Sequence, residues 1–436
     1  MSNSGKLTRR STLVLAAAAS AALPARAAAP ARQQGTIRGD SDADQSEAVQ
    51  KALDAARASG APLTLPPGRI RVANLVFPAS VRVVGVPGAT VLAADSGPVG
   101  TAPSADGLVL DGVGFTGGDG AALLTVSGSD GVRIVNCRFT GGATGLKLED
   151  VGGAVEDCAF AGSGIALFSN NSRGLTIRGN RLAECGNGGI LVWRDAPGAD
   201  GSVVSGNRIA GVRASDGGSG QNGNGINIYR ADDVVIADNV ISDCDFSAIR
   251  VNTGKNTSIR GNNCSNCREV AIYSEFAFSG SAIIGNIVDG ASGGISITNS
   301  DQGGRLATCS GNIVRNILPN SPTNPDATPF GIGAEADTVI TGNTVSDVPG
   351  IGIAAGYGAY LKNVLVADNV VSGADTGIAV SVADGIGPVR VAGNMIAGAK
   401  AGGIVGMRWT EVASTDLAAD AGRFPGVSVE GNVVAP

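Results

Sequence analysis

The amino-acid sequence predicts an all-β protein built as a parallel β-solenoid of about 12 coils. Two observations lead to this prediction: a pair of short recurring phrases, and a composition that is rich in glycine and poor in aromatic residues. Glycine supplies 67 of the 436 residues, whereas aromatic residues make up only 4%. Hydrophobic residues still make up 43% of the chain, so small and β-branched side chains suffice for one long core.

The first phrase is apolar-x-apolar-x-Gly-Asn-x-apolar, which recurs from about residue 130 with a minimum period of about 22 residues. Cys137 and Cys158 take the Asn position in two earlier copies. Asn tolerates a left-handed backbone and can hydrogen-bond its equivalent in the next coil, so we expect the copies to stack as a ladder. The ladder positions are Asn180, Asn207, Asn239, Asn262, Asn286, Asn312, Asn343, Asn369, Asn394 and Asn432.

The second phrase is a Gly-Ile or Ala-Ile pair about ten residues after each Asn, within alternating apolar and polar residues. This period of two predicts short strands, and the Gly and Asn residues between them predict corners. The chain shows no helical period between the strands, and units this small bury an apolar face only by stacking. The isoleucines of this phrase are Ile190, Ile226, Ile249, Ile272, Ile295, Ile332, Ile353, Ile378 and Ile404.

Residues 40–59 predict a helix that caps the N-terminal end of the solenoid. Ala48, Leu53 and Ala56 fall on one apolar face, and Gly60 ends the helix. Solenoids need such cover at their open ends. We interpret the acidic residues at the start of this segment as helix-capping groups, with a calcium loop as the alternative.

The N-terminal stretch is typical of an export signal that is cleaved from the mature chain. Arg9 and Arg10 precede an apolar run, Leu13–Leu23, which is too short to span a membrane. The paired arginines indicate the twin-arginine translocation machinery as a partner, with a general secretory signal as the alternative. No later segment is apolar enough to span a membrane, so we expect a periplasmic or secreted protein. The predicted parts are the signal peptide (1–29), the cap with the first strands (30–75) and the β-helix repeats (76–436).

The residue types exclude several kinds of chemistry. The chain contains no His, which removes His-based triads, His general bases and the commonest metal ligand. Its net charge is −6, or −10 without the four basic residues of the signal, which argues against unspecific binding of nucleic acid. We predict neither a metal nor a cofactor, while the export route leaves an unidentified cofactor open.

The seven cysteines align with apolar columns of the repeat. Cys185, Cys244 and Cys267 share a column that holds Val or Ala in other coils. Cys264 and Cys309 fall in Leu, Ile and Val columns, so we expect cysteines in the core. A metal or redox site at the CxxC of residues 264–267 is the alternative, and disulfides between adjacent coils remain open.

The predicted cap helix, the following segment Leu65-Pro-Pro-Gly68 and the Gly-Asn coils resemble the pectate-lyase-like right-handed parallel β-helix superfamily. With Arg9 and Arg10 included, the whole chain resembles the twin-arginine-translocated β-helix repeat proteins, a family without an assigned activity. The resemblance implies the fold and leaves the function open, because lyases, hydrolases, epimerases and inert spikes share it. The chain lacks an Asp-rich hydrolase signature, and epimerases that rely on His have no counterpart here.

One face of the solenoid holds the candidate site residues. If the Ile of each second phrase points inward, the first and third residues after it point outward. This alternation predicts a strip of exposed aromatic rings, followed by Arg, Glu and amide side chains in the next coils. Large exposed rings in a row favour a binding surface, and their flat faces suit sugars. The strip comprises Phe168, Trp193, Tyr229 and Tyr273.

Two long insertions, residues 213–225 and 316–330, are expected to flank this face as the walls of a trough. The alternative is that these are ordinary solvated residues and loops. The predicted floor consists of Arg250, Asn252, Tyr273, Glu275, Ser296 and Thr298. The predicted ligand is an oligo- or polysaccharide, with contacts from Phe168, Trp193, Asn227, Tyr229, Arg230 and Asn252.

Two catalytic schemes fit these residues. In hydrolysis, Glu275 and Glu335 act as acid and base, two coils or about 9.6 Å apart, near the upper limit for an inverting pair. In β-elimination or epimerisation of a uronate, Arg250 or Tyr273 is the base, and Arg230 holds the carboxylate. We therefore expect a carbohydrate-binding or polysaccharide-modifying protein. A non-catalytic envelope or adhesion module and a cofactor carrier are the alternatives.

Overall fold

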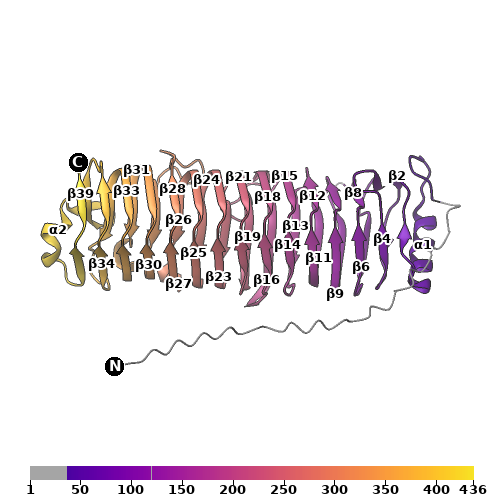
Figure 1. Ribbon diagram of the computed structural model, residues 1–436, viewed down its shortest axis with the longest axis horizontal. Coiled ribbons are helices and arrows are strands. Elements are labelled where there is room, and N and C mark those ends of the chain that lie inside the picture. Colours follow the sequence, from indigo (N-terminus) through magenta and orange to yellow (C-terminus); the bar gives the residue numbers. More distant parts are fainter. Residues whose placement is uncertain (1–36, 119) are drawn as a thin grey trace, which may run out of the picture.

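The computed structural model describes residues 37–118 and 120–436, which form one elongated solenoid of about 14 turns (Figure 1). Each turn passes through three parallel sheets, which we call sheets 1, 2 and 3 in chain order. The all-β solenoid predicted from the repeats is confirmed, with about two turns more than expected. The signal peptide with Arg9 and Arg10, and residues 30–36 of the predicted cap, lie outside the described residues.

Sheet 1 precedes the Asn corner in each turn, and sheet 2 follows it. The strands of sheet 1 are β1 (Leu63–Thr64), β4 (Arg82–Val84), β7 (Val109–Asp111), β9 (Ala122–Val135), β11 (Thr144–Glu156), β14 (Thr176–Arg178), β17 (Val203–Ser205), β20 (Val235–Ala237), β23 (Lys255–Arg260), β25 (Ser279–Ile284), β27 (Arg305–Ser310), β30 (Ala336–Thr341), β32 (Lys362–Ala367), β34 (Val389–Ala392) and β38 (Val427–Glu430). The strands of sheet 2 are β2 (Gly68–Arg71), β5 (Thr90–Ala93), β8 (Gly114–Thr116), β10 (Arg138–Thr140), β12 (Ala159–Ala161), β15 (Arg181–Cys185), β18 (Arg208–Val212), β21 (Val240–Cys244), β24 (Asn263–Glu275), β26 (Ile287–Ile297), β28 (Ile313–Arg315), β31 (Thr344–Ala355), β33 (Val370–Ser381), β35 (Met395–Ala397) and β39 (Val433–Ala435).

Sheet 3 carries the second phrase, and several long strands turn a corner to reach it. It contains the first parts of β9 and β11 and the last parts of β24, β26, β31 and β33. Its other strands are β3 (Leu75–Val76), β6 (Gly100–Pro103), β13 (Ile165–Asn170), β16 (Gly188–Ala199), β19 (Asn224–Asp232), β22 (Ile249–Asn252), β29 (Phe330–Ala334) and β36 (Gly402–Arg408).

Few elements lie outside these sheets. Strand β37 (Glu411–Ser414) pairs antiparallel with β36. The helices are α1 (Ser46–Ser59), α2 (Leu417–Asp420), η1 (Ser300–Gln302), η2 (Gly358–Tyr360) and η3 (Ala421–Arg423). Among the described residues, none of these helices has the length and apolarity that crossing a membrane requires.

The predicted Asn ladder is present from Asn180 to Asn432. At each step the side-chain oxygen of one Asn accepts from both the backbone N–H and the side-chain amide of the Asn one coil earlier. Asn262 Oδ1, for example, lies 3.1 Å from Asn239 N and 2.9 Å from Asn239 Nδ2. Asn262 Nδ2 also donates to Ile236 O at 3.0 Å. The ladder therefore satisfies polar groups that the corner would otherwise bury unpaired.

The isoleucines of the second phrase form one buried column in sheet 3, from Ile190 to Ile404, each in register with the next. The residue before each of these isoleucines is Gly or Ala. Where adjacent coils approach closely, a larger side chain at this position would clash. A Cβ added at Gly294 would lie 2.1 Å from the carbonyl oxygen of Gly331 in the next coil. Glycine at this position therefore lets the coils stack at strand spacing.

Helix α1 covers the N-terminal end of the solenoid (Figure 1). It begins at Ser46, six residues later than predicted, and buries Val49, Leu53 and Ala56 against the first coil. The Gln50 side chain pairs with the exposed edge of β3, accepting from Val76 N at 2.9 Å and donating to Val76 O at 3.0 Å. The helix thus supplies both apolar cover and hydrogen bonds to an edge that would otherwise be open.

All seven cysteines lie within the described residues, and all are buried as free thiols. The predicted columns are confirmed: Cys244 is in register with Val212 and Cys267, and Cys264 with Ile241 and Val288. Cys264 and Cys267 therefore belong to the core, which removes the geometric basis for a metal site at the CxxC.

Because the thiols are buried, we expect native protein to resist alkylation. Burial raises the pKa of Cys185 and of Cys309 to about 12, so little reactive thiolate forms at neutral pH. Mass spectrometry after maleimide treatment should find native protein essentially unlabelled and denatured protein labelled at all seven positions. Rapid labelling of Cys185, Cys244, Cys267 or Cys309 before unfolding would contradict the core assignment.

Candidate functional site

The outer face of sheet 3 carries two columns of outward side chains, as predicted from the second phrase. One column, nearer the two insertions, contains Leu191, Asn227, Arg250, Tyr273 and Ser296 in register. The other column contains Trp193, Tyr229, Asn252 and Glu275 in register.

The coil of Phe168 departs from the prediction. Leu167, rather than Ile165, is in register with Ile190, so Phe168 aligns with Leu191 and Asn170 aligns with Trp193. Counting the alternation from Ile165 predicts Ala166 and Phe168 as the outward pair of this coil; the register gives Phe168 and Asn170 instead, and Ala166 is buried. Phe168 still points outward because two residues preserve the alternation.

Three of the four predicted aromatic residues form a continuous row. The rings of Phe168 and Trp193 meet edge to face at 5.3 Å, and those of Trp193 and Tyr229 at 5.5 Å. All three are half-buried. Tyr273 stands apart from this row, because its ring lies under the guanidinium of Arg250 at 5.0 Å. We call Phe168, Trp193 and Tyr229 the aromatic row.

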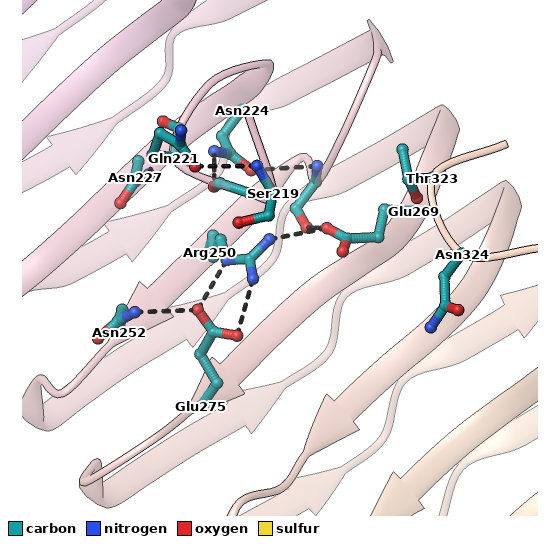
Figure 2. A network of polar contacts seen from close by, with 12 residues as sticks. Ser219, Gln221, Asn224, Asn227, Arg250, Asn252, Glu269, Glu275, Thr323 and Asn324 are labelled. Carbon is teal, nitrogen blue, oxygen red and sulfur yellow. Dashed lines mark hydrogen bonds and ion pairs between the residues drawn. The ribbon is translucent and has the colours of Figure 1, made fainter. Parts of the chain in front are cut away.

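Arg250 is the centre of a buried charged cluster (Figure 2). Its Nε lies 2.7 Å from Glu275 Oε1 and its Nη2 lies 2.9 Å from Glu275 Oε2, a bidentate pair. Its Nη1 donates to Glu269 Oε2 at 2.8 Å. Asn252 Nδ2 also donates to Glu275 Oε1 at 3.1 Å. We call Arg250, Glu269 and Glu275 the Arg250 cluster.

The Arg250 cluster is almost completely removed from solvent. Arg250 is 8% exposed and Glu275 is 3% exposed. Burial raises the pKa of Glu269, and the charge of Arg250 only partly offsets that effect. Burial tends to lower the pKa of Arg250, but its hydrogen bond to Glu275 and the charges of both carboxylates outweigh this and raise it. Arg250 is therefore a fixed cation.

Tyr273 is likewise not prepared to act as a base. Burial raises the pKa of its phenol, and the nearby charges of Glu275 and Glu269 raise it further. The phenol is consequently protonated at neutral pH. Because the pKa values of both Tyr273 and Arg250 are raised, neither side chain is suited to act as a base in the free protein.

The two insertions approach this face, and the first lies directly over Arg250. A Cβ added at Gly220 would lie 2.3 Å from Arg250 Nη1. Asn224 Nδ2 donates to Gly220 O at 2.8 Å, and Asn227 Nδ2 lies 3.5 Å from Gln221 O, so side chains of β19 hold the loop in place. Figure 2 shows Ser219 and Gln221 of this loop above Arg250.

The second insertion reaches back two coils, to the coil of Ile272. Ser321 Oγ and Thr323 Oγ1 lie 3.3 and 3.4 Å from Arg268 O. In Figure 2, Thr323 and Asn324 lie on the side of Glu269 away from Asn227. The predicted walls therefore flank the expected coils, but the floor is partly covered: Arg250, Glu275 and Ser296 are buried, and Asn252, Tyr273 and Thr298 are half-buried.

Glu335 and Arg230 lie outside the Arg250 cluster. Glu335 Oε2 accepts from the backbone N of Ser300 at 2.8 Å, and burial raises the pKa of this carboxyl. Arg230 donates from Nη1 to Asp195 O at 2.7 Å and lies 4.7 Å from the centroid of the Tyr229 ring, beside the aromatic row. The structure thus joins Arg250 with Tyr273 and Glu275, but leaves Glu335 and Arg230 apart from them.

Residues 198–415, half of the chain, match the family model described as the right handed beta helix region. The chain belongs to the right-handed β-helix family. Residues 110–275 of this right-handed β-helix protein also match a model described as the periplasmic copper-binding protein NosD. No curated protein matches the chain.

Several solved structures are similar to this chain at low identity. The mannuronan C-5 epimerase AlgE6 A-module of Azotobacter vinelandii is 16% identical, covering 92% of this chain and 97% of its own, with a TM-score of 0.43. The surface protein and adhesin PfbA of Streptococcus pneumoniae is 12% identical, covering 92% and 98%, with a TM-score of 0.45. A mannuronic acid specific polysaccharide family 6 lyase from human gut microbiota is 13% identical, covering 80% and 85%, with a TM-score of 0.45. These likenesses concern the fold alone.

Sequence reasoning missed two features of this right-handed β-helix protein. Glu269, the second carboxylate on Arg250, was overlooked because it falls before the second phrase, outside the alternating strand. A second aromatic group was also overlooked: Trp409 meets the rings of Tyr357 and Tyr360 edge to face at 5.2 and 5.9 Å. Trp409 and Tyr357 are each 47% exposed. The sequence did contain a signal for this second aromatic group, because Tyr357, Tyr360 and Trp409 are three of the six Trp and Tyr residues in the chain.

Proposed function

We propose that this right-handed β-helix protein is an exported carbohydrate-binding protein and that the outer face of sheet 3 is its binding surface. One observation carries the proposal: the aromatic row continues, coil by coil, into the Arg250 cluster on the same face. Half-buried rings in a row offer apolar edges and faces to the C–H surfaces of sugars. A buried charged cluster is costly unless function or specificity maintains it, and sites that break local rules are often functional.

Recognition of a uronate in this proposal falls to Arg230 rather than Arg250. Arg250 is already paired with two carboxylates, so it has little capacity for a third. Arg230 is half-buried beside Tyr229, where a sugar stacked on the aromatic row would meet it. Its guanidinium makes no ion pair within residues 37–118 and 120–436 and donates to Asp195 O from Nη1, which leaves its other N–H groups available to a ligand carboxylate.

Binding is favoured over catalysis by the protonation of the candidate groups. Tyr273 and Arg250 both hold their protons at neutral pH, and Glu275 is held in a bidentate pair. Polysaccharide modification is the second candidate, favoured by Glu335. Its carboxyl has a pKa raised by burial, which suits a group that donates a proton to a leaving oxygen.

The name of the NosD model raises copper as a possible ligand, but the donor set does not fit that metal. Copper sites are built from imidazole, thiolate and thioether groups. The chain has no His, and its cysteines are buried in the core. Within the part of the chain that the structure describes, no group of three or more Cys, Asp or Glu is placed to hold a metal ion. We therefore propose no copper site.

The proposal is tested by screening the folded mature chain against an oligosaccharide array and then measuring variants on the glycans that bind. Trp193→Ala should weaken binding by about 1–3 kcal/mol, because it removes the central ring of the aromatic row. Trp409→Ala is the matched control, since it removes the other Trp without touching sheet 3 near Arg250. The same incubations are analysed for new reducing ends or unsaturated products, which report modification.

Three results would contradict this proposal. One is a parent protein that binds no glycan on the array. Another is wild-type affinity in a folded Trp193→Ala variant. The third is a loss of affinity in Trp409→Ala alone, which would move the site to the Tyr357, Tyr360 and Trp409 group.

A further inference from the structure

A second candidate surface lies on sheet 2, away from the aromatic row and the Arg250 cluster. An open groove of about 490 Å³ runs across β10, β12, β15, β18 and β21. Three arginines and a set of alanines line it, from two outward columns of these strands. The residues used below are Arg138, Arg181, Arg208, Ala161, Ala183 and Ala210.

The register of sheet 2 brings the three arginines into one row. Arg138 aligns with Ala159, which aligns with Arg181, and Arg181 aligns directly with Arg208. Neighbouring strands are about 4.8 Å apart, so the guanidinium groups stem from points about 4.8 and 9.6 Å apart along the solenoid. All three side chains are exposed. We call Arg138, Arg181 and Arg208 the arginine row.

The arginine row has no internal counter-charge. Within residues 37–118 and 120–436, none of its side chains makes an ion pair or a hydrogen bond. Sheet 1 differs at an equivalent exposed position, where Arg178 pairs with Glu156 at 2.9 Å across adjacent coils. Like charges directly opposite one another on neighbouring strands destabilise a sheet. Arg181 and Arg208 carry that cost in a protein whose net charge is −6.

The surface beside the arginine row carries only small side chains and is backed by a close-packed core. Ala161, Ala183 and Ala210 align in the second outward column, so no long side chain fills the space next to the guanidinium groups. Beneath the first coils of the groove, Phe139 and Phe160 stack at 4.8 Å with nearly parallel rings. A close-packed aromatic core under the strands makes this floor rigid.

We infer that the arginine row and its alanine floor bind an acidic polysaccharide whose carboxylates lie along the solenoid axis. A guanidinium fork matches a planar carboxylate in bidentate geometry, and an anionic chain would remove the repulsion between Arg181 and Arg208. The groove is lined by no exposed aromatic ring, which disfavours nucleic-acid strands that bind by base stacking. This surface is separate from the site proposed on sheet 3, and neither depends on the other.

The experiment measures binding of the folded chain to immobilised polygalacturonate, with carboxyl-reduced polymer as the uncharged control. The Arg181→Gln/Arg208→Gln variant should bind about tenfold more weakly or worse. An Arg57→Gln/Arg260→Gln variant is the matched control: it removes the same charge from exposed arginines on α1 and sheet 1, and should bind like the parent. Binding by the parent should weaken as salt is raised, because these charges are exposed.

Two further readouts separate this proposal from structural effects and from the sheet 3 site. Without ligand, the Arg181→Gln/Arg208→Gln variant should melt at the same temperature as the parent or higher, because repulsion is removed. The Arg181→Gln/Arg208→Gln change should weaken polygalacturonate binding by the same factor in the parent and in a Trp193→Ala background, because the two surfaces are separate. The inference is overturned by a parent that does not distinguish polygalacturonate from the reduced polymer, by equal losses in the two double variants, or by tighter binding of single-stranded DNA through the same arginines.

Discussion

Replacing Arg250 with Met should lower the free energy of unfolding by about 3–5 kcal/mol, the range for breaking a buried ion pair by removing one partner. The loss is large because Glu275, only 3% exposed, would lose both of its hydrogen bonds from the guanidinium inside the protein. Glu269 would lose its partner at 2.8 Å as well. Urea unfolding followed by circular dichroism measures the effect.

The dependence on pH provides an internal control. In Arg250→Met, Glu269 should have a folded-state pKa above its unfolded value, because burial raises this pKa and the charge of Arg250 no longer offsets it, so the folded state binds more protons than the unfolded state. The destabilisation should therefore be full at neutral pH and shrink as the pH falls toward the unfolded pKa of Glu, about 4.3. An Arg250→Met/Glu275→Leu variant should recover part of the loss at neutral pH. A loss below about 1 kcal/mol, typical of a surface ion pair, would contradict the structural role of the cluster.

Replacing Asn262 with Ala should lower the free energy of unfolding by about 3–4 kcal/mol, since several buried polar groups lose partners together. Asn262 is 1% exposed and connects three coils. Its removal leaves Ile236 O without its amide donor and Asn239 N without its acceptor. Thermal unfolding gives the overall effect, and hydrogen exchange at the Asn239 amide should accelerate.

Asn432 provides the comparison for the ladder. It stands at the last step, where its hydrogen bonds are only partly buried or exposed. Asn432→Ala should therefore cost only about 1 kcal/mol. Equal losses at Asn262 and Asn432 would mean that burial of the ladder adds nothing to its strength.

The repeats alone predicted most of the fold, because register in a solenoid propagates from coil to coil. Once Asn180 and Ile190 were assigned to columns, the positions of Cys264 and of Ile404 followed by counting. The coil number was low because the first coils lack the Gly-Asn phrase. There Phe77 and Phe115 contact each other edge to face in the core. Such apolar contacts leave no periodic polar signal in the sequence.

The candidate site was less predictable, because the strand register gives the face on which a side chain lies but not the loops and corner residues that contact it. Alternation placed Arg250 and Glu275 on one face, but it gave no sign that the backbone at Gly220 would cover them. Glu269 approaches from the corner, where no strand periodicity applies. Phe168 was assigned to the wrong pair because Ile165 imitates the core position that Leu167 occupies. Inserted loops and corners escape periodic reasoning because their path depends on side chains from several coils.

The contacts of the Asn ladder join only neighbouring coils, and this has an evolutionary consequence. A coil gained or lost by duplication or deletion leaves the same contacts on both sides of the change, so the molecule can lengthen or shorten without redesign. The aromatic row, the Arg250 cluster and the arginine row each occupy a few successive coils. The distances between these surfaces can therefore change in unit steps of about 4.8 Å. The spacing between the binding surfaces along the solenoid is therefore always a whole number of coils.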